Sequence, residues 1–209
     1  MRPLFIVFEG LDGAGTTTQL HRLHGSLLRR GLRAEATSEP TSGPIGKVLR
    51  DAIEGRIALD PVAQALAFAA DRADHAFNPN GIAAALRDGR WVLCDRYVVS
   101  GLAYQASQGV DLGWLATINA KVQKPDVTIF IDTPVDVCAV RIAARGDGTE
   151  LFHDTAFLAT VRERYEQVLA TSEMLGTLLR VDGARPVDDV EAAIAQALAP
   201  LLRTGGLPE

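Results

Sequence analysis

Residues 4–17 read LFIVFEGLDGAGTT, and this stretch decides the fold class. Its first six residues form a short, almost wholly apolar run that ends at a glycine, a pattern typical of a strand buried on both faces. Beyond the glycine-rich segment, apolar residues recur at helical spacing from Thr16 to a stop signal at Gly31. The stretch therefore predicts a buried strand, a loop and a helix in direct succession.

The loop between strand and helix has the composition of a phosphate-binding loop. Gly10 and Gly15 let backbone N–H groups point inward, and the following helix adds its positive N-terminal end. Thr17 occupies the hydroxyl position that helps to hold Mg²⁺. Position 16, where such loops carry a lysine, holds Thr16. We therefore predict an ATP-binding loop that lacks one positive charge; its residues are Gly10, Leu11, Asp12, Gly13, Ala14, Gly15, Thr16, Thr17 and Thr18.

Strands and helices alternate along the rest of the chain. Further strands are predicted at residues 33–39, 91–95, 126–132 and 178–182, and helices at 43–53, 61–77, 78–89, about 100–121, 135–145, 157–170 and 187–202. Strands separated by helices pair in parallel through right-handed crossovers. This order predicts a three-layer α/β fold with a five-stranded parallel sheet flanked by helices. Because no linker or repeat divides the chain, we expect a single domain over residues 1–209.

The composition limits the kinds of partner. The chain has 209 residues, 47% of them hydrophobic, and a formal net charge of −5. It lacks the basic excess typical of nucleic-acid binding and any apolar stretch long enough to span a bilayer. The opening residues show no signal-peptide cleavage pattern, so we expect a cytoplasmic protein. Cys94 and Cys138 lie in apolar segments without metal-ligand spacing and are predicted to be buried.

Six segments in order carry a family resemblance that covers nearly the whole chain. They are FIVFEGLDGAGTTTQ (5–19), TSEPT (37–41), AFAADRADH (67–75), CDRYVVSGLAYQ (94–105), KPDVTIFIDTPVDV (124–137) and RIAAR (141–145). Together they resemble the bacterial thymidylate kinases. The resemblance implies a P-loop kinase fold and transfer of the γ-phosphate of ATP to dTMP, giving dTDP for dTTP synthesis. It also implies Mg²⁺ as cofactor, dTMP and ATP as small-molecule partners, and a homodimer.

The strand-end pair Asp95-Arg96 is predicted to lie where open α/β sheets bind ligands. A planar guanidinium suits a monophosphate, although a structural ion pair at the strand end is the alternative for Arg96. The resemblance implies that Arg96 holds the dTMP phosphate and that Asp95 supports Mg²⁺ together with Thr17. It further implies that Asp12 reaches the 3′-hydroxyl of the acceptor sugar.

Phe68 and Arg72 lie four residues apart and share one face of a predicted helix. The resemblance implies that they stack on thymine and donate to its carbonyl. The alternative places Phe68 in the core and pairs Arg72 with Asp71 or Asp74 on the surface. The predicted substrate-binding residues are Asp12, Glu39, Pro40, Phe68, Arg72, Arg96, Ser100, Tyr104 and Gln105.

Arg141 and Arg145 precede a polar, glycine-containing stretch that could close as a lid over residues 145–155. Arginine supplies fixed charge and bidentate contacts to a phosphoryl group, so these two are the first candidates to replace the missing lysine. A solvated helix face is the alternative for Arg141. The predicted catalytic residues are Asp12, Arg96, Arg141 and Arg145.

Several positions depart from the family pattern: Thr16, Ser38 before Glu39, Gly101 after Ser100, and the sequence TELFH in the lid. Most of these changes remove polar groups that would face phosphate or base. A nucleotide-binding but catalytically weak relative is therefore a second hypothesis, and a kinase for another nucleotide or nucleoside is a third. Arg96, as a monophosphate anchor, argues against a nucleoside acceptor.

Overall fold

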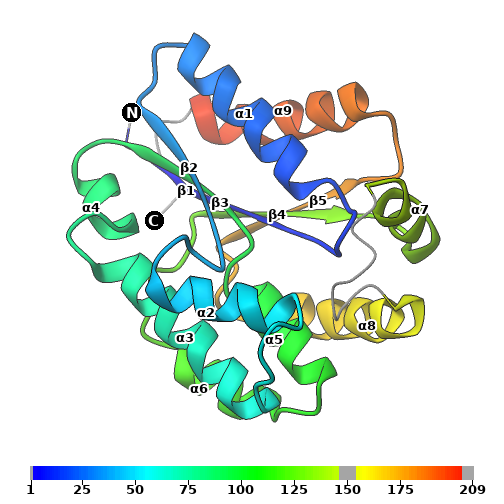
Figure 1. Ribbon diagram of the computed structural model, residues 1–209. Coiled ribbons are helices and arrows are strands. Elements are labelled where there is room, and N and C mark those ends of the chain that lie inside the picture. Colours follow the sequence, from blue (N-terminus) through cyan, green and yellow to red (C-terminus); the bar gives the residue numbers. More distant parts are fainter. Residues whose placement is uncertain (1, 146–153, 204–209) are drawn as a thin grey trace.

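The computed structural model describes residues 2–145 and 154–203 and has the predicted alternation of strands and helices (Figure 1). The strands are β1 (Phe5–Glu9), β2 (Ala34–Ser38), β3 (Trp91–Asp95), β4 (Val127–Asp132) and β5 (Thr177–Asp182). The helices are α1 (Thr16–Arg29), α2 (Pro44–Ile53), α3 (Pro61–Phe77), α4 (Ile82–Arg87), α5 (Val98–Ser107), α6 (Leu112–Asn119), α7 (Val135–Arg145), α8 (Thr155–Thr171) and α9 (Val187–Arg203).

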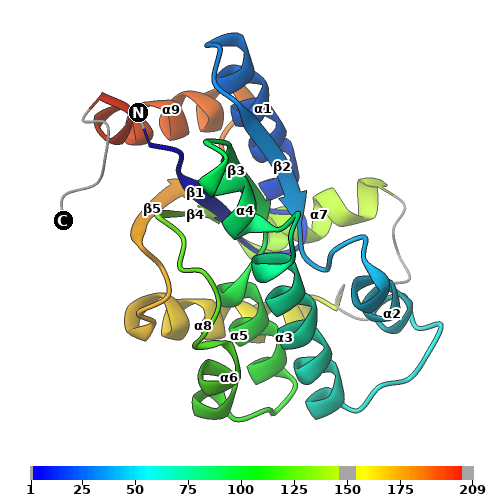
Figure 2. The ribbon, with the colours of Figure 1, turned by 90° about the vertical axis from the view of Figure 1, so that its left-hand side faces the viewer.

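The five strands form one sheet in the order β2-β3-β1-β4-β5, with every neighbouring pair parallel. Helices α1 and α9 lie on one side of the sheet, and α3, α5 and α8 lie on the other (Figures 1 and 2). The predicted three-layer α/β fold is confirmed. The chain leaves β1 toward β2 and later crosses from β3 to β4 on the other side of β1, so the strand order reverses there. Ligands of open α/β sheets bind at the carboxyl edge beside such a reversal.

Burial explains which strands are central. Every residue of β1 and β3 is buried, as is all of β4 except its last residue, in agreement with their nearly continuous apolar sequences. The edge strands β2 and β5 are only partly buried, and their sequences mix polar and apolar residues. The central strands therefore hold the carboxyl-edge residues in a rigid core.

Two predicted helical regions are corrected by the structure. The region predicted at about 100–121 is two helices, α5 and α6, because Gly109 takes a left-handed conformation (φ 91°) that ends the first. The helix predicted at 78–89 is confined to α4, since Asn78 caps α3 and a turn precedes Gly81. The other elements agree with prediction to within one or two residues at each end. Most of the predicted lid, residues 146–153, lies outside the described residues.

The two cysteines are buried, as predicted. In the described part of the chain, no helix combines the length and hydropathy that a membrane span requires.

Candidate functional site: a phosphate-binding loop beside a polar cavity

The loop after β1 depends on two glycines with positive φ. Gly13 has φ 81°, and a Cβ there would stand 2.6 Å from the carbonyl oxygen of Cys138 in α7. Gly15 has φ 100°, caps α1, and has no atom within 4 Å of a hypothetical Cβ. A side chain is therefore excluded by contact at Gly13 and by backbone conformation at Gly15. The open space at Gly15 leaves the N-terminal N–H groups of α1 accessible to an anion.

The Thr17 hydroxyl donates to Oδ2 of Asp95, so the first turn of α1 meets the end of β3. Oδ1 of the same carboxylate is buried and has no hydrogen-bond partner among the described residues. A buried carboxylate oxygen without a donor is unfavourable unless a cation or water satisfies it. The donor set therefore fits Mg²⁺, which protein sites bind through one or two carboxylates together with substrate phosphates. No group of three or more His, Cys, Asp or Glu side chains that could hold a metal ion occurs within residues 2–145 and 154–203.

Arg96 turns back from the end of β3 over the loop. Its backbone is left-handed (φ 66°), a conformation that costs free energy in a non-glycine residue and is concentrated at functional sites. Nη1 donates to the carbonyl oxygen of Gly10 at 3.0 Å, and Nη2 pairs with Oδ1 of Asp12 at 2.5 Å. The Arg96 ion pair is thus made with the loop and does not merely close the strand end.

Asp12 is held from a second direction by Tyr104 of α5. The Tyr104 hydroxyl donates to Oδ2 of Asp12 at 2.9 Å, and the Asp12 backbone N–H donates to the same hydroxyl oxygen at 3.1 Å. The guanidinium of Arg96 lies over the Tyr104 ring, 5.1 Å from its centroid. The loop, β3 and α5 therefore fix one another at a single charged cluster.

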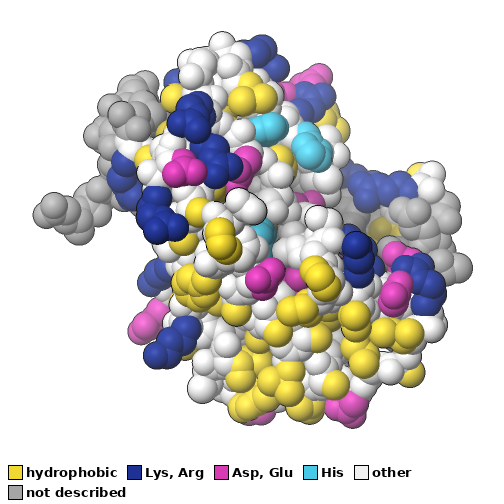
Figure 3. Space-filling view, turned by 60° about the vertical axis from the view of Figure 1, so that its left-hand side comes forward, with side chains coloured by type: hydrophobic (Ala, Val, Ile, Leu, Met, Phe, Trp, Pro, Cys, Tyr) yellow, Lys and Arg dark blue, Asp and Glu magenta, His cyan; other side chains and the backbone are white. Residues whose placement is uncertain are grey.

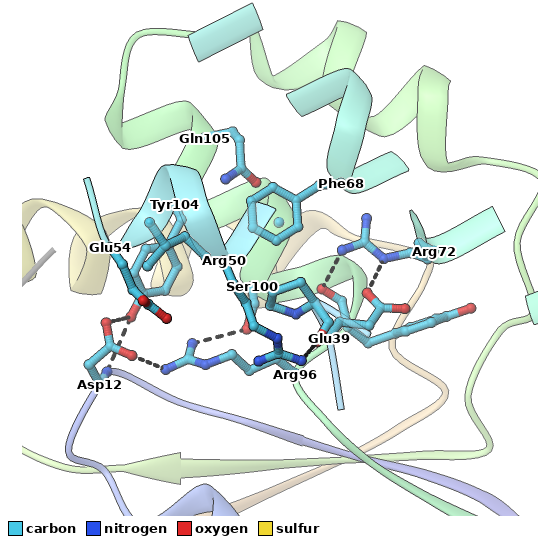
Figure 4. A pocket seen from close by; sticks show the side chains of 14 residues that line it. Asp12, Glu39, Arg50, Glu54, Phe68, Arg72, Arg96, Ser100, Tyr104 and Gln105 are labelled. Atoms are coloured by element: carbon cyan, nitrogen blue, oxygen red, sulfur yellow. Dashed lines mark hydrogen bonds and ion pairs between the residues drawn. The ribbon is translucent and has the colours of Figure 1, made fainter. Parts of the chain in front are cut away.

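A cavity of about 210 Å³ extends from this cluster toward α3 (Figure 4). Asp12 and Arg96 lie at one end, and Phe68 and Gln105 lie at the opposite end. The lining residues are Asp12, Glu39, Pro40, Arg50, Ile53, Glu54, Phe68, Arg72, Arg96, Tyr97, Ser100, Gly101, Tyr104 and Gln105. The structure thus brings every predicted substrate-binding residue to one cavity. One end is charged and the other carries an aromatic ring and an amide.

Arg72 is 1% exposed, which excludes its alternative assignment as a surface residue. Its Nε donates to Glu39 at 2.7 Å, Nη1 to Asn119, and Nη2 to the carbonyl oxygen of Tyr97 at 3.1 Å. Asp71 instead accepts two hydrogen bonds from Thr41. The guanidinium is therefore fixed in the cavity wall by three separate segments of the chain.

Phe68 is partly buried, lines the cavity, and is absent from the hydrophobic core cluster, so its alternative core assignment is wrong. Ser100 also lines the cavity. Its hydroxyl donates to the Glu9 carboxylate and lies 2.8 Å from the Tyr165 hydroxyl, with which it forms a second hydrogen bond. The Glu39-Pro40 peptide bond is cis, and the Glu39 carboxylate holds both Arg72 and His75.

The two arginines of α7 lie by a second cavity of about 120 Å³, on the other side of the loop. Arg141 is partly buried and donates to the carbonyl oxygens of Ala14 at 3.3 Å and Gly183 at 3.0 Å. A purely solvated helix face is therefore excluded for Arg141. Arg145 is exposed at the last position of α7 and lines the same cavity with Gly15 and Thr18.

Sequence reasoning missed several polar residues of the site, among them Arg50, Glu54, Glu9 and Tyr165. Arg50 of α2 lines the acceptor-side cavity and donates to the Pro40 carbonyl at 2.6 Å. Glu9 is fully buried and accepts from Ser100, from the Tyr97 N–H at 3.0 Å, and from Tyr165. Burial raises the pKa of Glu9, against the opposing effects of the Ser100 hydrogen bond and the Arg96 charge. A carboxylate at the end of an apolar strand was a usable signal for Glu9, whereas nothing local marked Tyr165.

A parallel sheet with a glycine loop at its reversal point, next to an arginine-bearing cavity, defines the P-loop nucleoside monophosphate kinases as the class of this protein. The thymidylate kinase family model matches residues 8–194, so the chain belongs to the thymidylate kinase family. It is 38% identical over 199 residues to a probable thymidylate kinase of Pyrococcus horikoshii, covering 93% of this chain and 95% of the relative. It is 37% identical over 201 residues to a probable thymidylate kinase of Pyrobaculum aerophilum, covering 95% and 98%. A provisionally named thymidylate kinase of Treponema pallidum is 40% identical over 177 residues, covering 85% and 84%.

Proposed function

We propose that this protein transfers the γ-phosphate of ATP to dTMP and so forms dTDP. The observation that carries the proposal is the single cavity that joins the Arg96–Asp12 cluster, beside the loop, to the Phe68–Arg72 end. A monophosphate held by Arg96 would extend its base toward Phe68. An uncharged pyrimidine suits a site with one aromatic face, a fixed guanidinium and the Gln105 amide.

In the proposed reaction the phosphate oxygen of dTMP attacks the γ-phosphorus of ATP. A bond forms between these two atoms, and the bond from the γ-phosphorus to the bridging oxygen breaks, giving dTDP and ADP. This transfer needs positioning and charge stabilisation and no covalent enzyme intermediate. Arg96 would anchor the acceptor phosphate, Asp12 the sugar hydroxyl, and Arg141 and Arg145 the donor phosphates.

We propose Mg²⁺ as the cofactor, held through Thr17 and Asp95. Support comes from the buried, unpartnered Oδ1 of Asp95 next to the Thr17 hydroxyl. A bound Mg²⁺ would neutralise charge on the bridging and transferred phosphates. Thr17 and Asp95 would orient it between the loop and the acceptor cavity.

A second candidate is a relative that binds nucleotide but turns it over weakly. The observation in its favour is Thr16, which supplies no cation where such loops carry lysine. The loss of one preorganised charge typically lowers kcat by about 10²- to 10³-fold. The loop glycines and α1 would still bind triphosphate in this case.

An ADP-release assay with ATP, Mg²⁺ and a panel of acceptors separates the candidates. We expect dTMP to be the best acceptor, ahead of dUMP, dCMP, AMP and thymidine. Faster use of dCMP, AMP or thymidine would overturn the substrate assignment. Tight ATP binding without measurable ADP release for any acceptor would favour the second candidate.

Arg96→Ala tests the anchor separately. We expect it to raise the KM for dTMP by roughly 10- to 100-fold, since a charge-assisted hydrogen bond contributes about 1.5–3 kcal/mol. The Kd for ATP, measured by titration calorimetry, should change much less. An equal loss of affinity for dTMP and for ATP would show that the acceptor and donor sites have been assigned wrongly.

We also propose a cytoplasmic homodimer that assembles through α3. Val62, Leu66 and Phe77 of this helix are 47%, 48% and 57% exposed, so α3 presents three large apolar side chains to solvent. Figure 3 shows apolar side chains gathered over the lower part of the molecule, where α3 lies. Because α3 also carries Phe68 and Arg72 toward the cavity, such an interface would support the base end of the site.

A further inference from the structure

His75 of α3 lies one helical turn beyond Arg72, and the two side chains contact the same carboxylate. Nε of Arg72 donates to Oε2 of Glu39 at 2.7 Å (Figure 4). Nδ1 of His75 lies 3.1 Å from Oε1 of Glu39 and bonds it. Residues three apart on a helix are neighbours on its surface, so both partners reach Glu39 from one side. Each carboxylate oxygen of Glu39 therefore has its own partner on α3.

The partners of the His75 ring determine which of its nitrogens donates to Glu39. An ionised carboxylate oxygen only accepts hydrogen bonds, so Nδ1 carries the hydrogen and donates to Glu39. Nε2 lies 2.8 Å from the Thr37 hydroxyl of β2, which donates to it when the ring is neutral. His75 is only 9% exposed, so little water competes for either nitrogen. The ring is therefore held at both nitrogens by the end of β2.

His75 acts behind the cavity wall, because Glu39 and Arg72 line the acceptor-side cavity and His75 is not among the described residues that do. A guanidinium has five N–H donors, and within the described part of the chain Arg72 uses three of them in hydrogen bonds. The other two remain for a ligand. The direction in which they point depends on how Glu39 holds Nε of Arg72.

We propose that His75 is a positioning residue for base recognition: it fixes the Glu39 carboxylate and thereby the N–H groups that Arg72 presents to the base. This inference rests on the proposed kinase function. Without His75, Arg72 would hold the carboxylate through one oxygen, and the group could turn about its last side-chain bond. The C4 oxygen of thymine accepts a hydrogen bond, whereas cytosine carries an amino group there. A displaced Arg72 therefore weakens the use of dTMP more than that of dCMP.

The variants His75→Leu and His75→Asn test this role. Leucine fills the site without a donor, whereas the amide of asparagine places an N–H group close to the position of Nδ1. Base selectivity is measured as kcat/KM for dTMP divided by kcat/KM for dCMP. His75→Leu should lower this ratio by about tenfold, the value of one hydrogen bond, while His75→Asn should stay within about threefold of the natural chain. The KM for ATP should not change in either variant.

His24→Leu is the matched control, because His24 also joins a helix to β2 through a ring nitrogen, 3.1 Å from the Ala34 carbonyl oxygen. Its selectivity should equal that of the natural chain. Thermal unfolding shows which variants are folded. If His75→Leu is not, His75→Gln takes its place, since the longer side chain carries its amide toward Thr37 and away from Oε1 of Glu39. An equal loss of selectivity in His75→Leu and His75→Asn, or in His75→Leu and His24→Leu, would overturn the proposal.

A measurement without nucleotide separates this role from the proposed reaction. The Nε–H group of Arg72 is buried and bonded to Glu39, so its signal in a proton–nitrogen correlation spectrum should exchange slowly with solvent. This exchange should be at least about tenfold faster in His75→Leu and unchanged in His75→Asn and His24→Leu. An unchanged rate in His75→Leu would overturn the proposal. If the natural chain forms no dTDP but exchange is still faster in His75→Leu, the kinase assignment fails and the positioning role of His75 stands.

Discussion

The guanidinium of Arg72 lies directly over Gly101. A Cβ at position 101 would stand 3.0 Å from Nη2 and 3.3 Å from Nη1 of Arg72. Because Glu39, Asn119 and the Tyr97 carbonyl hold three nitrogens of Arg72, the guanidinium has little freedom to move away. The absence of a side chain at Gly101 therefore sets the position of the arginine at the base end of the cavity.

Gly101→Ala should displace Arg72 and lower kcat/KM for dTMP by on the order of tenfold, the value of one hydrogen bond. The KM for ATP should not change, since the second cavity is on the other side of the loop. Gly25→Ala is the matched control, because its Cβ would meet only the mobile end of Arg29, at 3.2 Å. Unchanged dTMP kinetics in Gly101→Ala would show that Arg72 does not read the base.

Glu39 neutralises a buried arginine, and its removal should destabilise the whole fold. The side chains of Glu39 and Arg72 are each 2% exposed, so Glu39→Ala leaves an uncompensated buried charge. We expect the free energy of unfolding, measured with urea, to fall by about 3–5 kcal/mol. Glu35→Ala breaks the partly exposed pair with Arg90 and should lower the free energy of unfolding by only about 0–1 kcal/mol. Similar values for the two variants would contradict this account of the buried pair.

The sequence predicted those features that depend on local patterns. The loop was recognisable because Gly10 and Gly15 lie between a buried apolar run and a helical pattern, and the central strands were recognisable because their apolar runs are nearly continuous. The partners of Arg72 could not be predicted, since Glu39, Tyr97 and Asn119 come from three distant segments. Contacts of this kind arise from the crossovers of the sheet, which no local spacing records.

The same limit applies to the arginines. Local spacing suggested Arg141 and Arg145 as replacements for the loop lysine, because both precede the lid. The contact between Arg96 and Gly10 joins residues 86 positions apart and became visible only in the folded chain. The sequence therefore shows how many arginines could lie near the loop, but it does not show where each guanidinium lies in the folded chain.

Glu9 should make stability depend on pH in a defined direction. Burial raises its pKa above the ordinary value of 4.5, so the folded protein binds this proton more tightly than the unfolded chain does. The stabilisation from the bound proton is complete below pH 4.5 and is lost as the pH rises through the folded-state pKa. The difference in unfolding free energy between the natural chain and Glu9→Gln should therefore fall as the pH rises. The slope should be at most about 1.4 kcal/mol per pH unit. Urea titrations of both proteins from pH 4.5 to 8 measure this difference, and a rising difference would contradict the assignment.

The exposed face of α3 predicts the effect of a charge on assembly. Leu66→Glu places a carboxylate within the proposed interface, where burial of an unpaired charge is unfavourable. We expect the natural chain to sediment as a dimer and Leu66→Glu as a folded monomer. Val140→Glu is the control, because Val140 of α7 is 70% exposed on another helix and should leave the dimer intact. A natural chain that is monomeric at all concentrations would exclude the interface.

Thr17 should determine how much Mg²⁺ the enzyme needs. Its hydroxyl meets the Asp95 carboxylate, whose other oxygen is buried without a donor, so both groups are available to orient one cation. Thr17→Ala removes the hydroxyl and should raise the Mg²⁺ concentration for half-maximal activity by about 10- to 100-fold, the usual effect of disturbing groups around a metal. Thr17→Ser keeps the hydroxyl and should stay within a few-fold of the natural chain, whereas a general disturbance of α1 would affect both variants. If Thr17→Ala showed the natural Mg²⁺ dependence while losing ATP affinity, the hydroxyl would serve the phosphates directly and the proposed metal site would be wrong.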